Sequence, residues 1–568
     1  MKFLRFVECF ILVLFLLADV CLFLLGLCQR QLVNQMFYVK QDIVQLNPIN
    51  QLLFSAGLFL LLCLFNIVAQ KTIFRKTTKG HSFNLGRKSS RADVAEKRQD
   101  DFYYLVILTC ISLGCGIVFA INCPYLGADD QSAVWSMAAR LATGGTIENI
   151  DNSPYWLFYP NQRVMAMIYA VFIKLFHLSV KDQFAPRILN AIFLSSLPFL
   201  TYDFTYCIGG KSDSARMCSL LTFSFLPLFL YIWYIYPTLP AIPLSFGAAS
   251  LFLNGSRKNI RTKLIYWLAA DMLLIFLNVF YKGTLIFDIA VFVVSLFGIF
   301  TGTDEGFSIN KKQWHRLSIL LWGFCILFCL IGGKAVTRVL DNRFQSMTGL
   351  TFGEGLPTAN WIAMGLSDGE KAINGAGSWD PEIQKLYVQG DPEATKELAC
   401  ESIRSSIRLL QKKDSRGVPH ALSFFTEKMV REWEDPWFNS TKSIHRYETV
   451  PDRYRDLDVF LGGETIPWLG KLLTVFKNTI YLTAGVWTIY LLHKLRVAPD
   501  SCGLLSFYQL LPFVYFIGGF LFQFIWEAKS RYCLPYFVFL IPVSSLAISG
   551  FGSASVLHRL RKATGRYE

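Results

Sequence analysis

Two adjacent carboxylates, Asp129 and Asp130, follow a long apolar run. Each of two neighbouring acids raises the pKa of the other, and an ionised carboxylate beside an acceptor hydroxyl can take its proton as a general base. The structural alternative is that the pair caps a helix predicted over 132–142, since Asp is a preferred N-cap residue. Both interpretations place the two acids where a helix begins just outside an apolar segment.

Three charged residues, Glu527, Lys529 and Arg531, alternate with small residues between two late apolar runs. The planar guanidinium group of an Arg can bind a phosphate through two parallel hydrogen bonds, and a Lys adds a point charge. The neighbouring Trp526 and Tyr532 are also the residues that an interfacial aromatic belt contains. The three charges favour an anion site over a simple belt.

A single lysine, Lys282, stands between two apolar runs that are joined by almost no loop. A lysine in this position either snorkels to the interface or meets an anion. The adjacent Gly283 has no side chain, so a headgroup can approach its backbone. The pair is a second candidate contact for a lipid phosphate.

A junction between a loop and a helix contains Tyr159, Pro160, Asn161 and Arg163. Pro fixes the backbone at the helix entry, and the Asn and Arg side chains can donate hydrogen bonds to an anionic group. Taken alone, this pattern is that of an ordinary junction. Its interest lies in its position relative to the other charged residues.

Long apolar segments must position these residues. The chain is 53% hydrophobic and 17% charged, whereas a soluble globular protein carries about 25% charged residues. Apolar runs of about eighteen residues or more recur, and each matches the ~30 Å hydrocarbon core of a bilayer. The sequence therefore predicts an all-α polytopic membrane protein with about twelve transmembrane helices. The predicted spans are 7–28, 50–70, 103–122, 187–207, 217–235, 239–255, 264–280, 284–302, 317–335, 471–492, 505–526 and 533–552.

Basic residues in the connecting loops set the predicted orientation. The loop 71–102 is rich in Lys and Arg, which places it in the cytoplasm. Counting spans from this loop puts 123–186 and 336–470 outside and both termini in the cytoplasm. These loops account for the net charge of +14 better than nucleic-acid binding does. We expect a multi-pass protein of the cell membrane that binds no nucleic acid.

The segment 164–178 is apolar but short, and it contains Lys174. If it crossed the membrane, every later basic loop would lie outside, so we expect an interfacial or re-entrant helix. Within the outer segment 336–470, an amphipathic helix is predicted over 394–411.

The chain is predicted to have four parts, of which the first, 1–102, contains two transmembrane helices and a basic cytoplasmic loop. A transmembrane core at 103–335 carries the first outer loop, 123–186. An extracytoplasmic domain of mixed or mainly α structure follows at 336–470. The last part, 471–568, holds three transmembrane helices and a basic tail.

The predicted topology places the acid pair, the Lys282 turn, the Asn161 junction and the Arg531 cluster on one outer side. A cavity formed by these residues suits a substrate with a lipid tail in the bilayer and an anionic head at its surface. The fourteen Cys residues are scattered, mostly inside apolar runs, without metal-ligand spacing. They are interpreted as small hydrophobic residues.

These motifs resemble those of the GT-C-fold integral membrane glycosyltransferases. The most similar group is the superfamily of protein O-mannosyltransferases and aminoarabinose transferases, including cell-envelope members of Gram-positive type. The resemblance covers about 103–552. It rests on Asp129-Asp130, Tyr159-Pro160-Asn161, Lys282-Gly283, and Glu527 with Arg531-Tyr532 and Pro535. A stretch from Leu356 to Leu366, which contains Trp361, resembles a segment of the Gram-positive members.

The resemblance implies a polyprenyl-phosphate-linked sugar donor and inverting transfer at the extracytoplasmic face. The acceptor would be a cell-wall polymer, a glycolipid or a protein. An Asp of the first outer loop would be the general base, and Asp130, which precedes Gln131, is favoured over Asp129. The usual family pattern is Asp-Glu, or one acid followed by Gln, so the Asp-Asp-Gln of this chain departs from it.

The resemblance also implies roles for the remaining residues. Lys282 and Arg531, with Lys529 beside them, would hold the donor phosphate, and Glu527 would orient them or contact the sugar. Trp361 would stack on a sugar face, although a buried structural Trp is an equal alternative. The set implied to bind substrate is Tyr159, Asn161, Arg163 and Trp361. The spans 7–28 and 50–70 precede the usual first catalytic span and have no assigned role.

Two other functions compete with a glycosyltransferase. A transporter or flippase for a lipid-linked anionic substrate would place charge near the bilayer midplane and show internal repeats. This chain instead gathers charge at one face. A non-catalytic scaffold for envelope assembly would use 336–470 to bind partners. No cofactor is implied with certainty, although the acidic pair leaves room for a divalent metal ion, which no His or second acidic motif supports.

Overall fold

The computed structural model describes most of the chain. The described residues are 2–36, 47–72, 91–122, 126–127, 130–144, 155–178, 183–209, 211–256, 258, 260–301, 311–349, 355–368, 375–380, 382, 391–413, 417–440, 444–445, 465–497 and 507–551.

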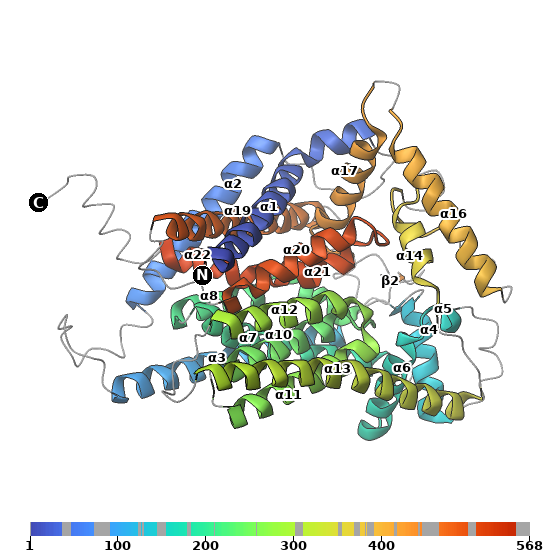
Figure 1. Ribbon diagram of the computed structural model, residues 1–568, viewed down its shortest axis with the longest axis horizontal. Helices are drawn as coiled ribbons and strands as arrows, with labels where there is room; N and C mark the ends of the chain where they lie inside the picture. The colour runs from blue at the N-terminus through green and yellow to red at the C-terminus, as the bar shows by residue number, and fades with distance from the viewer. Residues whose placement is uncertain are drawn as a thin grey trace, which may run out of the picture.

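The described part of the chain is almost entirely helical (Figure 1). The first half contains α1 (Lys2–Met36), α2 (Pro48–Thr72), α3 (Arg91–Ile121), α4 (Asp130–Thr143), α5 (Tyr155–Phe158), α6 (Asn161–Phe176), α7 (Phe184–Gly209), α8 (Ser212–Phe223), α9 (Leu226–Leu230), η2 (Tyr231–Trp233), α10 (Thr238–Ser256) and α11 (Ile260–Phe280). The second half contains η3 (Lys282–Thr284), α12 (Leu285–Thr301), α13 (Lys311–Thr348), α14 (Thr358–Gly365), α16 (Pro392–Leu410), α17 (His420–Trp433), α19 (Thr465–Val497), η5 (Phe507–Leu510), α20 (Leu511–Gln523), α21 (Ser530–Val538) and α22 (Leu540–Phe551). Two short strands, β1 (Leu126–Gly127) and β2 (Ile444–His445), pair antiparallel.

Six of the described helices are long and apolar enough to cross a membrane, or eight spans when two bent pairs are included. The predicted all-α polytopic membrane fold is confirmed. The other four predicted spans are helical as well. They correspond to α10, α12, α19 and α20, of which α12 and α20 are shorter apolar helices.

The predicted span 217–235 is a broken helix. Its two halves, α8 and α9–η2, meet at an angle of 52°. Pro227, at the start of α9, has no backbone N–H to continue the helical ladder. The side-chain amide of Asn190 on α7 donates to the carbonyls of Ile232 and Tyr234 at 3.3 and 3.1 Å. Unpaired backbone groups are costly inside a membrane, so Asn190 makes this irregular backbone tolerable.

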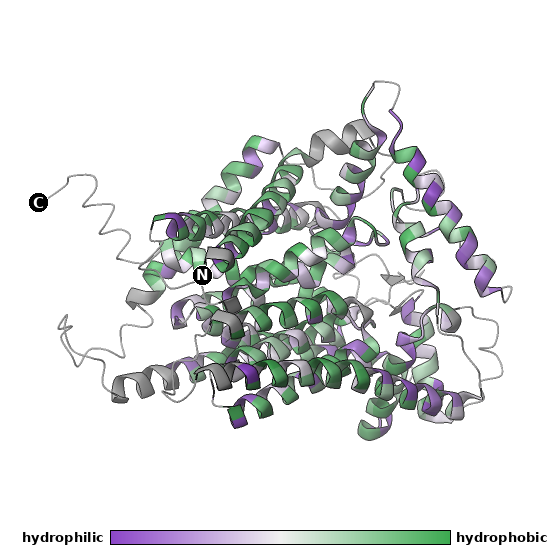
Figure 2. Cartoon of the chain, viewed as in Figure 1, coloured by the Kyte–Doolittle hydropathy of each residue, from purple (hydrophilic) through white to green (hydrophobic). Residues whose placement is uncertain are grey.

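The long helices form one bundle, and several short ones gather at one of its ends (Figure 1). The name "site end" is used for the end that carries α4, α5, α6, α14, α16 and α17. Apolar residues cover most of the bundle, whereas α16 at the site end is strongly polar along one side (Figure 2). Large apolar side chains stay exposed along the outer faces of α1, α2, α3 and α13. Such a surface is expected where lipid replaces water.

The segment predicted to be interfacial or re-entrant forms α6, which lies with α4 at the site end (Figure 1). One side of α6 is buried, through residues such as Val164 and Tyr169, while Val171 and Leu175 on the other side are exposed. An amphipathic helix of this kind suits the plane of an interface.

Two helices can be compared with the predictions for 336–470. The predicted amphipathic helix 394–411 is α16, whose N-cap residue, Asp391, accepts a hydrogen bond from the backbone N–H of Ala394 at 2.9 Å. Helix α13 continues to Thr348, beyond the predicted end of its span at 335. The segment 336–470 therefore begins as a continuation of α13.

Candidate active site

Arg531 lies at the centre of the charged residues of the site end. It stands in the first turn of α21 and is 4% exposed. Its guanidinium carbon lies 4.5 Å from the ring centre of Tyr236 and 5.2 Å from that of Tyr532. One terminal nitrogen donates to the Tyr234 hydroxyl. The rings of Tyr234, Tyr236 and Tyr532, named here the tyrosine box, fix the direction of the guanidinium group through cation–π and hydrogen-bond contacts.

Asp130 is the acidic partner of Arg531. Helix α4 begins at Asp130, and its carboxylate oxygen Oδ2 lies 3.2 Å from Nη2 of Arg531. A carboxylate in the first turn is stabilised by the helix dipole. The next residue, Gln131, is fully buried and accepts a hydrogen bond from the backbone N–H of Ile235 at 2.7 Å. Gln131 thus fixes the start of α4 against the segment that carries the tyrosine box.

Glu527 and Lys529 also belong to the charged cluster around Arg531. The Glu527 side chain is fully buried, and its Oε1 lies 2.9 Å from Nζ of Lys529. The Tyr532 hydroxyl donates to the other Glu527 oxygen at 3.1 Å and also contacts Nη2 of Arg531 at 3.4 Å. Burial lowers the pKa of Lys529, but the Glu527 carboxylate overcomes this and raises it above its ordinary value. Lys529 therefore stays cationic.

Lys428 of α17 positions the segment that carries these charges. It is fully buried, and its ammonium group donates to the carbonyls of Gly365 and Trp526 at 2.6 Å each and of Phe524 at 3.2 Å. These carbonyls terminate α14 and the α20 segment, so one cation satisfies two helix ends. Burial lowers the pKa of Lys428 to about 8, against the opposing effect of the Glu432 carboxylate.

Two further contacts hold the segment between α20 and α21. The backbone N–H of Ala528 donates to the carbonyl of Gly377 at 2.7 Å. The Ser530 hydroxyl donates to Asp435 Oδ2 at 2.7 Å. The charged segment is therefore fixed by residues of the segment 336–470 as well as by its own helices.

Tyr159 and Trp361 form an aromatic wall beside the charges. Their ring centres lie 5.8 Å apart, and Trp361 stacks on Trp526 with its ring centre at 5.7 Å. Burial raises the pKa of the Tyr159 phenol; the Lys529 ammonium group opposes this rise, and the Asp130 and Glu527 carboxylates add to it. Tyr159 is therefore a neutral donor next to the charged cluster.

The other two residues of the predicted substrate-binding set contact the protein itself. Asn161 donates to the carbonyl of Phe280 at 3.4 Å, which connects α6 to α11. Arg163 is 2% exposed, lies 3.3 Å from Asp341 of α13 and donates to the carbonyl of Trp156 at 3.1 Å. These contacts give both residues a positioning function.

The turn that contains Lys282 is anchored by a polar chain. The Thr284 hydroxyl donates to Asn278 Oδ1, and the Asn278 amide donates to Asp288 Oδ2, each at 2.5 Å. Gly283 is required here, because an added Cβ would lie 2.8 Å from the Tyr281 ring. The Lys282 side chain and the whole of Asp129 lie outside the described residues.

Sequence reasoning assigned no role to Tyr234, Tyr236, Gln131 or Lys428. The two tyrosines belong to an aromatic run that ends at Pro237, on the predicted outer side. That enrichment was a usable signal. Nothing in the sequence marks Lys428, because a basic residue in an amphipathic helix is normally exposed. No group of His, Cys, Asp and Glu suited to a metal ion occurs among the described residues.

Comparison with known proteins returns two solved structures, both of ArnT from Cupriavidus metallidurans. One is bound to undecaprenyl phosphate: the chains are 13% identical, 81% of this chain and 79% of that chain are covered, and the TM-score is 0.33. The other, in the apo state, gives 13% identity, 78% coverage of each chain and the same TM-score. No family model and no curated protein matches the chain.

Proposed function

We propose that the protein is a membrane glycosyltransferase that moves a sugar from a polyprenyl-phosphate donor to an acceptor hydroxyl at the extracytoplasmic face. The observation that carries the proposal is the buried Arg531, which reaches Asp130 at 3.2 Å while its tyrosine box connects it to Glu527. A cation, a candidate base and a second acid thus meet at the membrane-surface end of a helix bundle. This arrangement suits a donor with an anionic head and a lipid tail.

Binding of the donor would free Asp130 from its ion pair with Arg531. The phosphate of the donor offers Arg531 a more highly charged partner than Asp130, so it would replace the Asp130 carboxylate on the guanidinium group. Lys529 belongs to the same charged cluster, and Lys282 is the further candidate cation. Asp130, freed from its ion pair, would then accept the proton of the acceptor hydroxyl.

The bonds, the proton and the leaving group of the transfer step are all accounted for by the donor, the acceptor and Asp130. The acceptor oxygen attacks the anomeric carbon, the bond from that carbon to the phosphate oxygen breaks, and the released proton goes to Asp130. Attack opposite the leaving phosphate inverts the anomeric centre. The leaving group carries its charge away as polyprenyl phosphate, so it requires electrostatic stabilisation by Arg531 and Lys529 rather than protonation. Glu527 orients Lys529 through their ion pair.

The test begins by finding the missing sugar. Mass spectrometry of the envelope polymers of a deletion strain would identify the sugar and its attachment point. Complementation with Asp130→Asn is then expected to reduce transfer by about 10²- to 10⁴-fold, as for loss of a general base. Glu401→Gln, which also neutralises an acid but lies exposed on α16, is the control and should restore the sugar fully.

Three outcomes separate the competing functions. Full complementation by Asp130→Asn, with normal amounts of protein, would overturn the catalytic assignment and favour a scaffold. Accumulation of the sugar-charged lipid on the cytoplasmic side of the deletion strain would indicate a flippase instead. In detergent, no membrane has to be crossed. Loss of transfer from a purified lipid-phosphate donor in Asp130→Asn, under conditions where the wild type transfers the sugar, would support the enzyme.

A further inference from the structure

A groove of about 1020 Å³ lies between α12 and α13 and carries none of the cluster residues Asp130, Glu527, Lys529 or Arg531. A polar contact between neighbouring elements lies at each of its ends. At the site end, Arg163 lies 3.3 Å from Asp341. At the other end, the Trp322 indole donates to the carbonyl of Phe292 at 3.0 Å.

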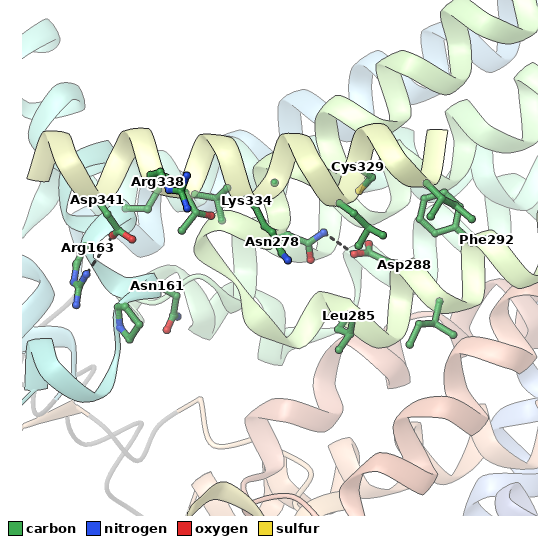
Figure 3. A pocket seen from close by; sticks show the side chains of 18 of the residues that line it. Asn161, Arg163, Asn278, Leu285, Asp288, Phe292, Cys329, Lys334, Arg338 and Asp341 are labelled. Carbon is green, nitrogen blue, oxygen red and sulfur yellow. Dashed lines mark hydrogen bonds and ion pairs between the residues drawn. The ribbon is translucent and has the colours of Figure 1, made fainter. Parts of the chain in front are cut away.

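The groove is most polar near Asp341 and most apolar near Trp322, with the Asp288 carboxylate between the two ends (Figure 3). The end near Trp322 is lined by Phe292, Leu296 and Ile326, which are apolar. The end near Asp341 carries Lys334 and Arg338 on successive turns of α13. Both cations are exposed, and among the described residues neither has a hydrogen bond or an ion pair. Their charge is therefore available to an outside ligand.

The position of these cations matches the surface of one bilayer leaflet. The predicted span 317–335 has its centre at residue 326. At 1.5 Å per residue, Lys334 and Arg338 lie about 12 and 18 Å beyond that centre. Half of the hydrocarbon core is about 15 Å thick, so the two cations lie on either side of the boundary between acyl chains and headgroups. Snorkelling explains why a single cation at this boundary is exposed. It does not explain why two cations stand at the mouth of one groove.

The groove opens sideways toward the surrounding lipid. Several residues that line it are also exposed: Leu285 by 57%, Ile289 by 51% and Leu330 by 58%. A ligand in the groove would therefore keep part of its apolar surface in the bilayer. A lipid with two acyl chains meets this requirement, because one chain fills the groove while the other covers its exposed apolar rim.

We propose that this groove is a binding site for an anionic phospholipid of the surrounding leaflet, with Lys334 and Arg338 holding its headgroup phosphate. The site is separate from the proposed donor site at Arg531 and does not depend on the proposed function. It is nevertheless connected to the site end, because Asn161 and Arg163 of α6 stand at its polar mouth. Occupation of the groove would fasten α13 to α12 beside α6.

The test measures lipid binding to the full-length protein in a neutral detergent. Native mass spectrometry would follow the titration of phosphatidylglycerol, phosphatidylcholine, polyprenyl phosphate and inorganic phosphate. We expect one tightly held phosphatidylglycerol, and about 30-fold weaker binding in Lys334→Ala/Arg338→Ala, since each cation contributes to binding an anionic lipid surface. Bound phosphatidylglycerol should also raise the unfolding temperature of the wild type, and much less that of the double variant.

Two matched controls make the result specific. Arg404→Ala/Arg408→Ala removes the same charge, with the same spacing, from an exposed part of α16 and should bind as the wild type does. Ile326→Trp fills the apolar end and should abolish the tight binding, while Leu327→Trp, on the neighbouring exposed position, should not.

Four results would overturn the proposal. Equal binding of phosphatidylcholine would show that the headgroup charge is irrelevant. Equal losses in both double variants would indicate a general charge effect, and unchanged binding in Ile326→Trp would place the lipid elsewhere. The fourth result is that polyprenyl phosphate binds ten-fold more tightly than phosphatidylglycerol and that this binding is lost in Lys334→Ala/Arg338→Ala. It would assign the groove to the sugar carrier instead.

Discussion

Arg531 illustrates how a single buried charge can be kept available for a substrate. Its guanidinium group is held by the rings of three tyrosines and by Asp130, and its Nε has no hydrogen-bond partner among the described residues. A fully buried cation with incomplete partners is costly. Replacement of Asp130 by a ligand with more acceptor oxygens would reduce that cost. The free energy released would then contribute to donor binding.

Replacement of this residue by lysine tests the need for a planar fork. In Arg531→Lys the charge is kept, but a Lys cannot form two parallel hydrogen bonds or stack in the tyrosine box in the same way. The loss of one charge-assisted hydrogen bond corresponds to about a 10- to 100-fold lower transfer rate at low donor concentration. Arg404→Lys, at an exposed position of α16, is the control and should change nothing. Transfer within three-fold of the wild type in Arg531→Lys would show that only the charge matters.

At the scale of elements, α17 and α14 act as a clamp on the charged segment. The Lys428 ammonium group connects both to the end of α20. Gly365 must be glycine for this contact, since an added Cβ would lie 2.3 Å from the Ile525 carbonyl oxygen. Helix α14 therefore approaches the end of the α20 segment backbone to backbone, and a small shift of α17 would move Glu527 and Arg531 together.

Lys428 gives the clamp a predicted pH dependence. An ammonium group has three donors for the three carbonyls, whereas the neutral amine has two. Since the pKa is lowered to about 8, transfer in the wild type should fall as the pH rises through 8. In Lys428→Met, transfer should already be about 10-fold lower at pH 7 and should be flat from pH 7 to 9. A wild-type profile without a decrease near pH 8, or a variant that keeps it, would contradict this role.

The sign of the linked stability change separates this effect from unfolding. Between about pH 8 and the ordinary value of 10.5, the unfolded chain holds a proton at Lys428 that the folded protein has released. The contribution of this group to the free energy of unfolding therefore rises with pH in that window. Thermal unfolding measured at pH 7.5 and 9 should show no loss of stability that is due to Lys428, so a decrease in transfer would report the site itself.

The sequence predicted the helices more accurately than the bends within them and the positions of their ends. Apolar runs were sufficient to place the transmembrane helices, because burial in lipid dominates their composition. The bend between α8 and α9 was not predicted, since it depends on Pro227 and on Asn190, a residue of a different helix. The extension of α13 to Thr348 was also missed. Its polar last turns are held by the Arg163–Asp341 pair, and hydropathy does not detect such a contact.

At the scale of the whole molecule, the proximity of Asp130 and Arg531 follows from topology. The two residues are 401 positions apart in the chain, and no local pattern connects them. Counting spans from the basic loop 71–102 placed both on one side, and the structure places them at the same end of the bundle. The count could not supply the tyrosine box or Lys428, because these depend on the side-chain packing of distant helices.

The direction in which the site end faces is the last prediction. We propose that it faces away from the cytoplasm, because α3, which begins at Arg91 within the basic segment 71–102, starts at the opposite end of the bundle (Figure 1). A cysteine-free variant would carry one new cysteine, either Glu401→Cys on α16 or Lys494→Cys near the end of α19, both of which are exposed. A membrane-impermeant maleimide applied to intact cells should label position 401 and reach position 494 only after the cells are opened. The reverse pattern would put Asp130 and Arg531 on the cytoplasmic side, where a donor displayed on the outer leaflet could not reach them. The proposed reaction would then have no substrate, whatever the contacts within the site.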